Sequence, residues 1–458
     1  MDQLIDIIEK RTNSNLPFQE LSSRLHNAIT LKQIIFAAFG LALFVAVIIV
    51  EETLTARAQP MEKAGVCPCC GSALESKGFG GREIRSIIGL IQWRRRIWRC
   101  PKGCKIGQIV PLDEELGISP NQKISDEIKQ LGCLLAVFVP YQIAAMLMSA
   151  LTGAAVSPIS IWNWVQIIGS KAVLKLEQEL KELSEGKLPK MAEIEDKVAK
   201  LITAIGADGV MVAFRPDGGV PEGKVEWREV KIGIFARLGE KLTKHGKKVN
   251  VIVRKRVVAV LGKIDELIPR MRLMAEKERI HEAESVVWLS DGAPGFWRVF
   301  EETFCGCATG VLDFYHAVQN VWKGARAWFD GRTKHARQWF ASARRSIRNG
   351  KVRYVLAEIR GALSTEEIPE STRKILQNLV VYLETHVEHM SYDQFKALGL
   401  PIGSGMVEST CKWLIQQRFK GVGMRWSEQG FNTLLHLRLA WVNETFDELF
   451  AETASPNS

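Results

Sequence analysis

Three β-rich runs decide the fold: ADGVMVAF at 207–214, VEWREVKIGIFA at 225–236 and VNVIVRKRVVAVL at 249–261. Runs rich in Val, Ile and Phe are typical of strands, and PDGGVPEG at 216–223 predicts a turn after the first of them. Two shorter runs follow, VVWLS at 286–290 and CATGVLD at 307–313, each preceded by a helical segment. Three strands, a helix, a strand, a helix and a strand predict a mixed α/β domain with a central sheet, beginning near Leu201.

Three acidic residues stand in or near these runs. Asp208 lies within the first run, Asp291 ends VVWLS, and Glu408 follows IGSGMV at the start of a predicted helix. Carboxylates at such sites commonly converge, and two Mg²⁺ ions about 4 Å apart need oxygen ligands from several elements. An Asp-Gly pair is also an ordinary turn signal, so each residue taken alone carries little weight. Together they are candidate metal ligands.

Length and composition bound the rest of the chain. With 458 residues it is long enough for about three domains. Hydrophobic residues make up 47% and charged residues 24%, which excludes fibrous and wholly disordered proteins. Lys and Arg outnumber Asp and Glu by 61 to 51, an excess that favours polyanionic partners.

Most of this excess lies in one segment. Between Ala317 and Arg360 there are eleven Lys or Arg and two acidic residues, which leaves a net charge of +9. The tryptophans of the segment, Trp322, Trp328 and Trp339, interleave with the cations. A basic helical arm with aromatic residues suits a DNA backbone with unstacked bases, and Arg344 and Arg345 are candidate contacts. Ordinary helix packing could use the same tryptophans.

Two close cysteine pairs form a separate module. CPCCG holds Cys67 and Cys70, CPKGC holds Cys100 and Cys104, and a β-like stretch of twenty-nine residues separates the pairs. Four thiolates on Pro/Gly turns predict a zinc ribbon with one structural Zn²⁺, although buried free cysteines remain the alternative. Cys69 lies inside the first turn and could replace a ligand. The nine cysteines do not form the pattern of a disulfide framework, so we expect a reducing compartment.

The hairpin of this module is basic and aromatic. Its second strand, IQWRRRIWRC, places Trp93 and Trp98 beside a group of cations, of which Arg94, Arg95 and Arg96 are candidate DNA contacts. Such a strand suits phosphate contacts with aromatic support. A charged edge that protects the sheet from aggregation is the alternative.

A helix-turn-helix is predicted next. PYQIAAMLMSALTG and ISIWNWVQIIGSK read as two helices, with Gly153 as the break and Ser157 as the cap of the second helix. In such motifs the second helix enters the major groove with polar residues near its start. The candidate contacts here are Ser160, Asn163 and Gln166. A helical hairpin that only packs in a core would look similar.

An uncharged run of seventeen residues, IIFAAFGLALFVAVIIV at 34–50, is the main exception to a soluble pattern. A helix that is apolar all round lies either in lipid or inside protein, and this length is at the lower limit for a membrane span. We predict that protein covers it, in a dimer, with a membrane anchor as the alternative. The N-terminal MDQLIDIIEKR lacks the basic start and cleavage site of a signal peptide.

Several of these segments resemble bacterial insertion-sequence transposases of the DDE type, the ISKra-like group in particular. ADGVMV, WREVKIGIF, LSDGAPGFW, VLDFYHA and LPIGSGMVESTCKWLIQQRFKGVGMRW look like successive signatures of that group. The CPCCG module, PLDEELGI and SALTGAAVS are similar to its N-terminal half, so the resemblance covers about residues 65 to 445. The apolar run at 34–50 departs from the more charged helix that the resemblance leads us to expect there.

The resemblance implies an RNase H-like catalytic domain in which Asp208, Asp291 and Glu408 hold two Mg²⁺ ions, for which Mn²⁺ could substitute. Asp313 and His316 match a supporting DxxH element. The implied reaction is hydrolysis at a transposon end, followed by attack of the freed 3′-hydroxyl on target DNA.

The chain's own residues extend this picture of the site. Lys412 is one turn after Glu408 and could hold a phosphate, and Arg418 would extend the basic surface. Asp313 is the rival acid for third ligand, because it also ends a predicted strand.

The partners implied are DNA, as terminal inverted repeats and target, and further copies of the chain in a homodimer or higher oligomer. A bacterial cytoplasmic location at the nucleoid follows. Two alternatives stay open: a transposase-derived DNA-binding regulator without catalysis, and an RNase H-like structure-selective nuclease. The intact acids argue against the first, and the predicted DNA-reading modules argue against the second.

The prediction is therefore an α+β multidomain protein. Its predicted parts are an N-terminal helical region at 1–62, a zinc ribbon at 63–115, a helix-turn-helix region at 116–175, a charged connector at 176–200, the first part of the catalytic core at 201–316, a basic helical insertion at 317–400, and a catalytic C-terminal helix with tail at 401–458.

Overall fold

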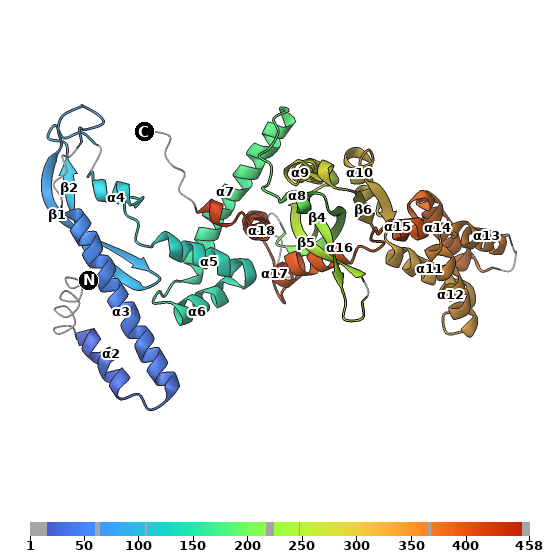
Figure 1. Ribbon diagram of the computed structural model, residues 1–458, viewed down its shortest axis with the longest axis horizontal. Helices are drawn as coiled ribbons and strands as arrows, with labels where there is room; N and C mark the ends of the chain where they lie inside the picture. The colour runs from blue at the N-terminus through green and yellow to red at the C-terminus, as the bar shows by residue number, and fades with distance from the viewer. Residues whose placement is uncertain are drawn as a thin grey trace. The chain divides into compact units, whose positions relative to one another are not determined.

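The computed structural model describes residues 16–59, 65–105, 108–216, 224–246, 248–364 and 368–450. Most of the predicted turn at 216–223, and the N-terminal segment that we compared with signal peptides, lie outside these residues. The chain divides into two compact units, Met1–Ile168 with Asp447–Ser458, and Gly169–Phe446. Each unit is described by itself, and the colours of Figure 1 follow the chain through both.

The first unit contains a long hairpin and helices. Strand β1 (Glu75–Ser86) pairs antiparallel with β2 (Gly89–Arg99). The helices of this unit are α2 (Leu16–His26), α3 (Leu31–Ala58), α4 (Pro111–Glu115), α5 (Asp126–Phe138), α6 (Tyr141–Leu151) and the start of α7 (Pro158–Ser184). The end of α3 packs on the hairpin, because Val50, Leu54 and Ala58 join the apolar cluster around Ile91 and Trp93.

Helix α3 contains the uncharged run, and the described residues of this chain cover little of it, so the predicted cover in a dimer stays a prediction. The helix starts with a capping box between Thr30 and Gln33. Of its 28 residues, all of which the structure describes, three are buried: Ala37, Ile48 and Ala58. The short α2 covers one face only, through contacts such as Phe18 with Phe44 (ring centroids 5.7 Å apart). By length and composition α3 is able to cross a membrane.

The second unit is built on a five-stranded mixed sheet with the order β5-β4-β3-β6-β7. The strands are β3 (Ile202–Phe214), β4 (Glu226–Leu242), β5 (Lys248–Leu261), β6 (Val286–Ser290) and β7 (Thr309–Leu312). The first three are antiparallel neighbours, whereas β6 and β7 run parallel to β3. The predicted order of strands and helices is confirmed.

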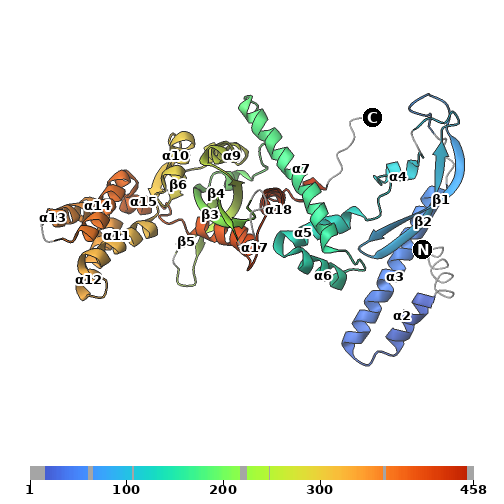
Figure 2. The ribbon, with the colours of Figure 1, turned by 180° about the vertical axis from the view of Figure 1, so that it is seen from behind.

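Helices pack around this sheet. Those next to the strands are α8 (Asp196–Ala199), α9 (Ile264–Lys277), α10 (Pro294–Thr303), α16 (Gly405–Cys411), α17 (Gln417–Phe419) and α18 (Glu428–Val442). A π-helical turn, Lys412–Gln416, joins α16 to α17. Figure 2 shows α17 lying over the green strands. Helix α7 runs into the predicted connector and ends at Ser184, before Gly186 adopts a positive φ of 82°.

The predicted basic insertion is helical. It contains α11 (Phe314–Phe329), α12 (Lys334–Arg348), α13 (Val352–Leu363), α14 (Glu370–Thr385) and α15 (Tyr392–Ala397), which lie together on the β6 side of the sheet (Figure 1). Two of its tryptophans are half-buried and pack against the core: Trp328 stacks on Phe329 with ring centroids 4.2 Å apart, and its ring centroid is 5.3 Å from that of Trp339. For these two residues the packing interpretation holds.

Candidate active site

The register of two parallel strands brings the first two acids together. Gly206 of β3 pairs with Leu289 of β6, and Asp208 and Asp291 each follow two residues later. The two carboxylates therefore occupy equivalent positions on neighbouring strands, with Asp208 in the middle of β3 and Asp291 just after the end of β6. Asp291 Oδ1 accepts a hydrogen bond from the backbone N–H of Ala293 (3.0 Å), which closes the turn after β6.

Helix α16, which carries the third acid, packs against the same strand. A Cβ atom at Gly206 would lie 2.7 Å from Val407 of this helix and 2.7 Å from the Leu289 carbonyl oxygen. Only a glycine permits this approach of helix to strand. One turn beyond Glu408, the Sγ atom of Cys411 lies 3.7 Å from Asp208 Oδ2. Glu408 is thus carried on a short helix that is packed against the strand of Asp208.

The environment of Asp208 disfavours its negative charge. Burial raises the pKa of this half-buried carboxyl, and the neighbouring charge of Asp291 raises that pKa further. Hydrogen bonds from the Gly209 N–H (2.7 Å) and from the Cys411 thiol act in the opposite direction. Burial and Asp208 raise the pKa of Cys411, so this thiol stays protonated and donates. The site thus concentrates negative charge that a cation would compensate.

Glu408 is exposed and already has a cationic partner. Lys412 Nζ donates to Glu408 Oε1 at 2.7 Å, and this contact lowers the pKa of the carboxyl below its ordinary value. His316 lines the same cavity as Glu408. We expected Lys412 to hold a phosphate, whereas here it neutralises Glu408.

Asp313 is 2% exposed and is saturated with hydrogen bonds. It caps α11 by accepting from the backbone N–H groups of Tyr315 (2.6 Å) and His316 (2.9 Å). Its other oxygen accepts from the backbone N–H and the hydroxyl of Ser404, just before α16. Asp313 therefore fixes the loop that positions Glu408. A cavity of about 430 Å³ opens beside these residues and is lined by Glu408 and His316.

Sequence reasoning missed two residues of this site. Cys411 could have been noticed, because it follows Glu408 by three residues and so shares its helix face. Tyr382 gave no signal: its hydroxyl donates to the Asp291 carbonyl oxygen (3.1 Å) across 91 residues of sequence.

The four cysteines of the first unit converge. The Sγ atoms of Cys67, Cys70, Cys100 and Cys104 all lie within 4.8 Å of one another, so they could hold a metal ion such as zinc. Both turns use a glycine with φ of 67°, Gly71 in the first and Gly103 in the second. Cys69 is exposed and lies outside the cluster.

Two of the predicted DNA contacts are wrong, because their side chains are inside the protein. Arg95 is buried and its Nε donates to both carboxylate oxygens of Asp113 (3.0 and 3.1 Å). Arg418 is also buried, with its guanidinium 5.4 Å from the ring of Trp426. A buried guanidinium cannot reach a phosphate on a DNA surface.

The other candidate contacts remain accessible. Arg94 is exposed, and the half-buried Arg96 lies 4.6 Å over the ring of Phe79. In the predicted helix-turn-helix, α6 and α7 are present and Ser157 caps α7 by accepting from the Ser160 N–H (3.1 Å). The accessible side chains also include Ser160, Asn163, Gln166, Arg344 and Arg345, of which Ser160 and Gln166 are half-buried.

Comparisons with known proteins give distant similarity. No family model matches the chain. The UPF0236 protein in the vanSb 3′ region of Streptococcus gallolyticus is 24% identical over 372 residues, which is 80% of this chain and 74% of that protein. A solved structure, the Drosophila P element transposase strand transfer complex, aligns over 74% of this chain and 84% of that chain, with 10% identity and a TM-score of 0.28.

Proposed function

We propose that this chain is a DDE-type transposase of a bacterial insertion sequence, which binds transposon ends and catalyses Mg²⁺-dependent strand cleavage and strand transfer. One observation carries the proposal: Asp208 and Asp291 lie at equivalent positions of adjacent parallel strands, with Glu408 on the helix packed against β3. Chemistry on phosphodiesters by paired divalent ions uses such a set of carboxylates from separate elements.

The topology supports an RNase H-like interpretation of the second unit. Three antiparallel strands are followed by two parallel ones, and the acids sit on β3, after β6 and on a later helix. The helical insertion enters after β7 and before the helix of the third acid. This is the arrangement that the resemblance to DDE transposases leads us to expect.

The donor set fits hard divalent ions. Asp208, Asp291 and Glu408 offer carboxylate oxygens, the ligands that Mg²⁺ and Mn²⁺ prefer. Burial and the charge of Asp291 raise the pKa of Asp208. A cation bound between the two carboxylates would offset the repulsion between their negative charges. Bound there, paired divalent ions supply activation of an attacking oxygen and stabilisation of a leaving oxygen.

The protein's own residues hold this arrangement. Cys411 donates to Asp208, and Asp313 fixes the Ser404 loop that precedes α16. Lys412 lies beside Glu408, and its ammonium group would be available for a phosphate if the carboxylate held a metal ion. The basic helical insertion supplies the positive surface that DNA requires.

The test starts from the DNA that flanks the gene. It should carry terminal inverted repeats, and the purified full chain should cleave such ends with Mg²⁺ and join them to a target. Asp208→Ala should lower both reactions by at least about a hundredfold while repeat binding stays within about twofold, because phosphate contacts lie elsewhere. Asp196→Ala, at an exposed carboxylate, is the control.

A wild-type protein that binds the repeats and cleaves none of them would contradict the proposal. It would favour the DNA-binding regulator.

A further inference from the structure

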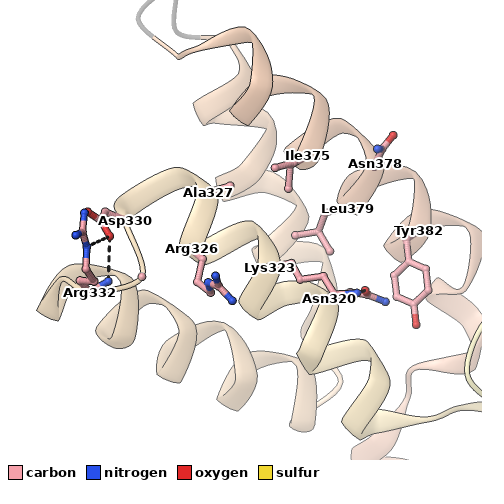
Figure 3. Close-up of a pocket in the computed structure, with 11 residues that line it drawn as sticks. Asn320, Lys323, Arg326, Ala327, Asp330, Arg332, Ile375, Asn378, Leu379 and Tyr382 are labelled. Carbon is pink, nitrogen blue, oxygen red and sulfur yellow. Dashed lines mark hydrogen bonds and ion pairs between the residues drawn. The ribbon is translucent and has the colours of Figure 1, made fainter.

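The insertion helices line a pocket of about 920 Å³. None of the three acids of the candidate active site lines it. It lies between α11, the turn that follows α11, and α14. Figure 3 shows how the two helices face each other, with Asn320, Lys323 and Ala327 on α11 and Ile375, Leu379 and Tyr382 on α14. The volume is that of a small-molecule site and is too small for duplex DNA.

The two helices that line the pocket also reach the candidate active site. His316, Asn320, Lys323 and Ala327 recur at helical spacing, so they share one face of α11. On α14, Tyr382 reaches back to the Asp291 carbonyl oxygen at 3.1 Å. A Cβ atom at Gly292, where φ is 98°, would lie 2.7 Å from the Tyr382 ring. Helix α11 therefore carries His316 of the candidate site, and helix α14 is hydrogen-bonded to Asp291 through Tyr382.

The lining is cationic on one side and apolar on the other. Its charged groups are Lys323, Arg326, Arg332 and a single carboxylate, Asp330, which pairs with Arg332 at 2.9 Å. Lys323 donates only to the amide of Asn320 (2.9 Å), and Arg326 has no ion-pair partner among the described residues. The cations could bind a phosphate, the apolar side chains could contact a base, and the amides of Asn320 and Asn378 could form hydrogen bonds with it.

We propose that this pocket receives an unpaired nucleotide of the DNA strand that is being cut or joined. Lys323 is seven residues from His316, or about 10 Å along the helix. Measured by the rise of one B-form strand, this is about three nucleotides. The inference rests on the proposed function, because it is the catalytic site that brings a strand to this face.

The experiment measures binding of a fluorescent hexathymidylate to the full chain, in EDTA so that no catalysis intervenes. Two matched variants of α14 replace an exposed apolar residue by Glu: Ile375→Glu inside the pocket and Val381→Glu outside it. The first should weaken binding by about fivefold or more, because it sets a carboxylate against the phosphate. The second should change it less than about twofold.

A charge-removal pair gives an independent readout. Lys323→Ala with Arg326→Ala should lower the salt dependence of binding by about one to two units of the logarithmic slope. Lys181→Ala with Lys190→Ala removes the same charge from exposed positions of the connector, which hold no candidate DNA contact, and should change affinity much less. Circular dichroism of each variant establishes that it is folded.

Three results would overturn the assignment. Equal effects of Ile375→Glu and Val381→Glu would mean that the pocket is not the binding site. Displacement of the oligonucleotide by equal concentrations of thymidine monophosphate would assign the pocket to a free nucleotide. Displacement by inorganic phosphate would assign it to phosphate alone. Failure of the proposed function is a separate result, because the wild type would then bind the repeats and cleave none of them, whatever the pocket binds.

Discussion

At the scale of single residues, the negative charge of Asp208 lowers the stability of the folded, metal-free protein. Burial and Asp291 raise the pKa of Asp208, so the folded chain holds this proton more tightly than the unfolded chain. The ionised form therefore costs stability above the raised pKa. This cost fades as the pH falls through that pKa and is gone below about 4, where unfolded aspartate is protonated as well.

Asp208→Asn should accordingly stabilise the metal-free protein near pH 7. We expect the melting temperature to rise by roughly 2 °C, and the gain to disappear in acid. Divalent metal should stabilise the wild type and not the variant. Asp196→Asn, at an exposed position, should change nothing. A lower melting temperature for Asp208→Asn in EDTA would mean that the carboxylate is a net stabiliser.

Cys411 is the second residue whose role can be isolated. Its thiol donates to Asp208, so Cys411→Ala should raise the pKa of that carboxyl and move the acid limb of the cleavage profile to higher pH. Cys411→Ser keeps a donor and should restore the profile. We expect cleavage to fall on the order of tenfold for the alanine variant. Identical pH profiles for both variants would mean that Cys411 contributes only packing and that its hydrogen bond to Asp208 does not affect cleavage.

At the scale of elements, the sequence predicted what local pattern controls. The runs of Val, Ile and Phe predicted the strands, and the acids within or just after them, with Glu408 on a later helix, predicted the carboxylate site. Burial of Arg95 and Arg418 could not be predicted, because it depends on partners elsewhere, Asp113 for one and the ring of Trp426 for the other. The contact of Tyr382 with Asp291 likewise exists only once the insertion has folded back.

The cysteine module can be tested as an element. Elemental analysis should find one zinc per chain, held by the four clustered thiolates. Cys100→Ser should lose the metal, because a structural site contributes folding energy through every ligand. Cys69→Ser is the matched control and should keep the metal, since Cys69 is exposed and outside the cluster. Equal zinc contents in the two variants would contradict the assignment.

At the scale of the whole molecule, the exposed face of α3 requires a covering. Phe36 and Phe39 are 63% and 50% exposed, which is uncommon for a face that stays in water. We expect a second copy to cover it. The end of α3 is held on the hairpin through Leu54, so substitution is a better test than truncation.

Replacing Ile35, Phe36 and Phe39 by Gln should shift the purified protein from dimer to monomer in light scattering. Equivalent changes at Leu188, Leu398 and Val422, which are also exposed, should not. A membrane anchor predicts another result. The wild type would then stay in the membrane fraction after a high-salt wash, and only the α3 variant would be released.

The central claim is that Asp208, Asp291 and Glu408 form one metal site, and the position of a bound ion tests it most directly. Crystals of the full chain soaked in Mn²⁺ should show an anomalous peak within about 2.5 Å of carboxylate oxygens of Asp208 and Asp291, with Glu408 turned toward it from Lys412. A peak at Asp313, with none between Asp208 and Asp291, would contradict the account.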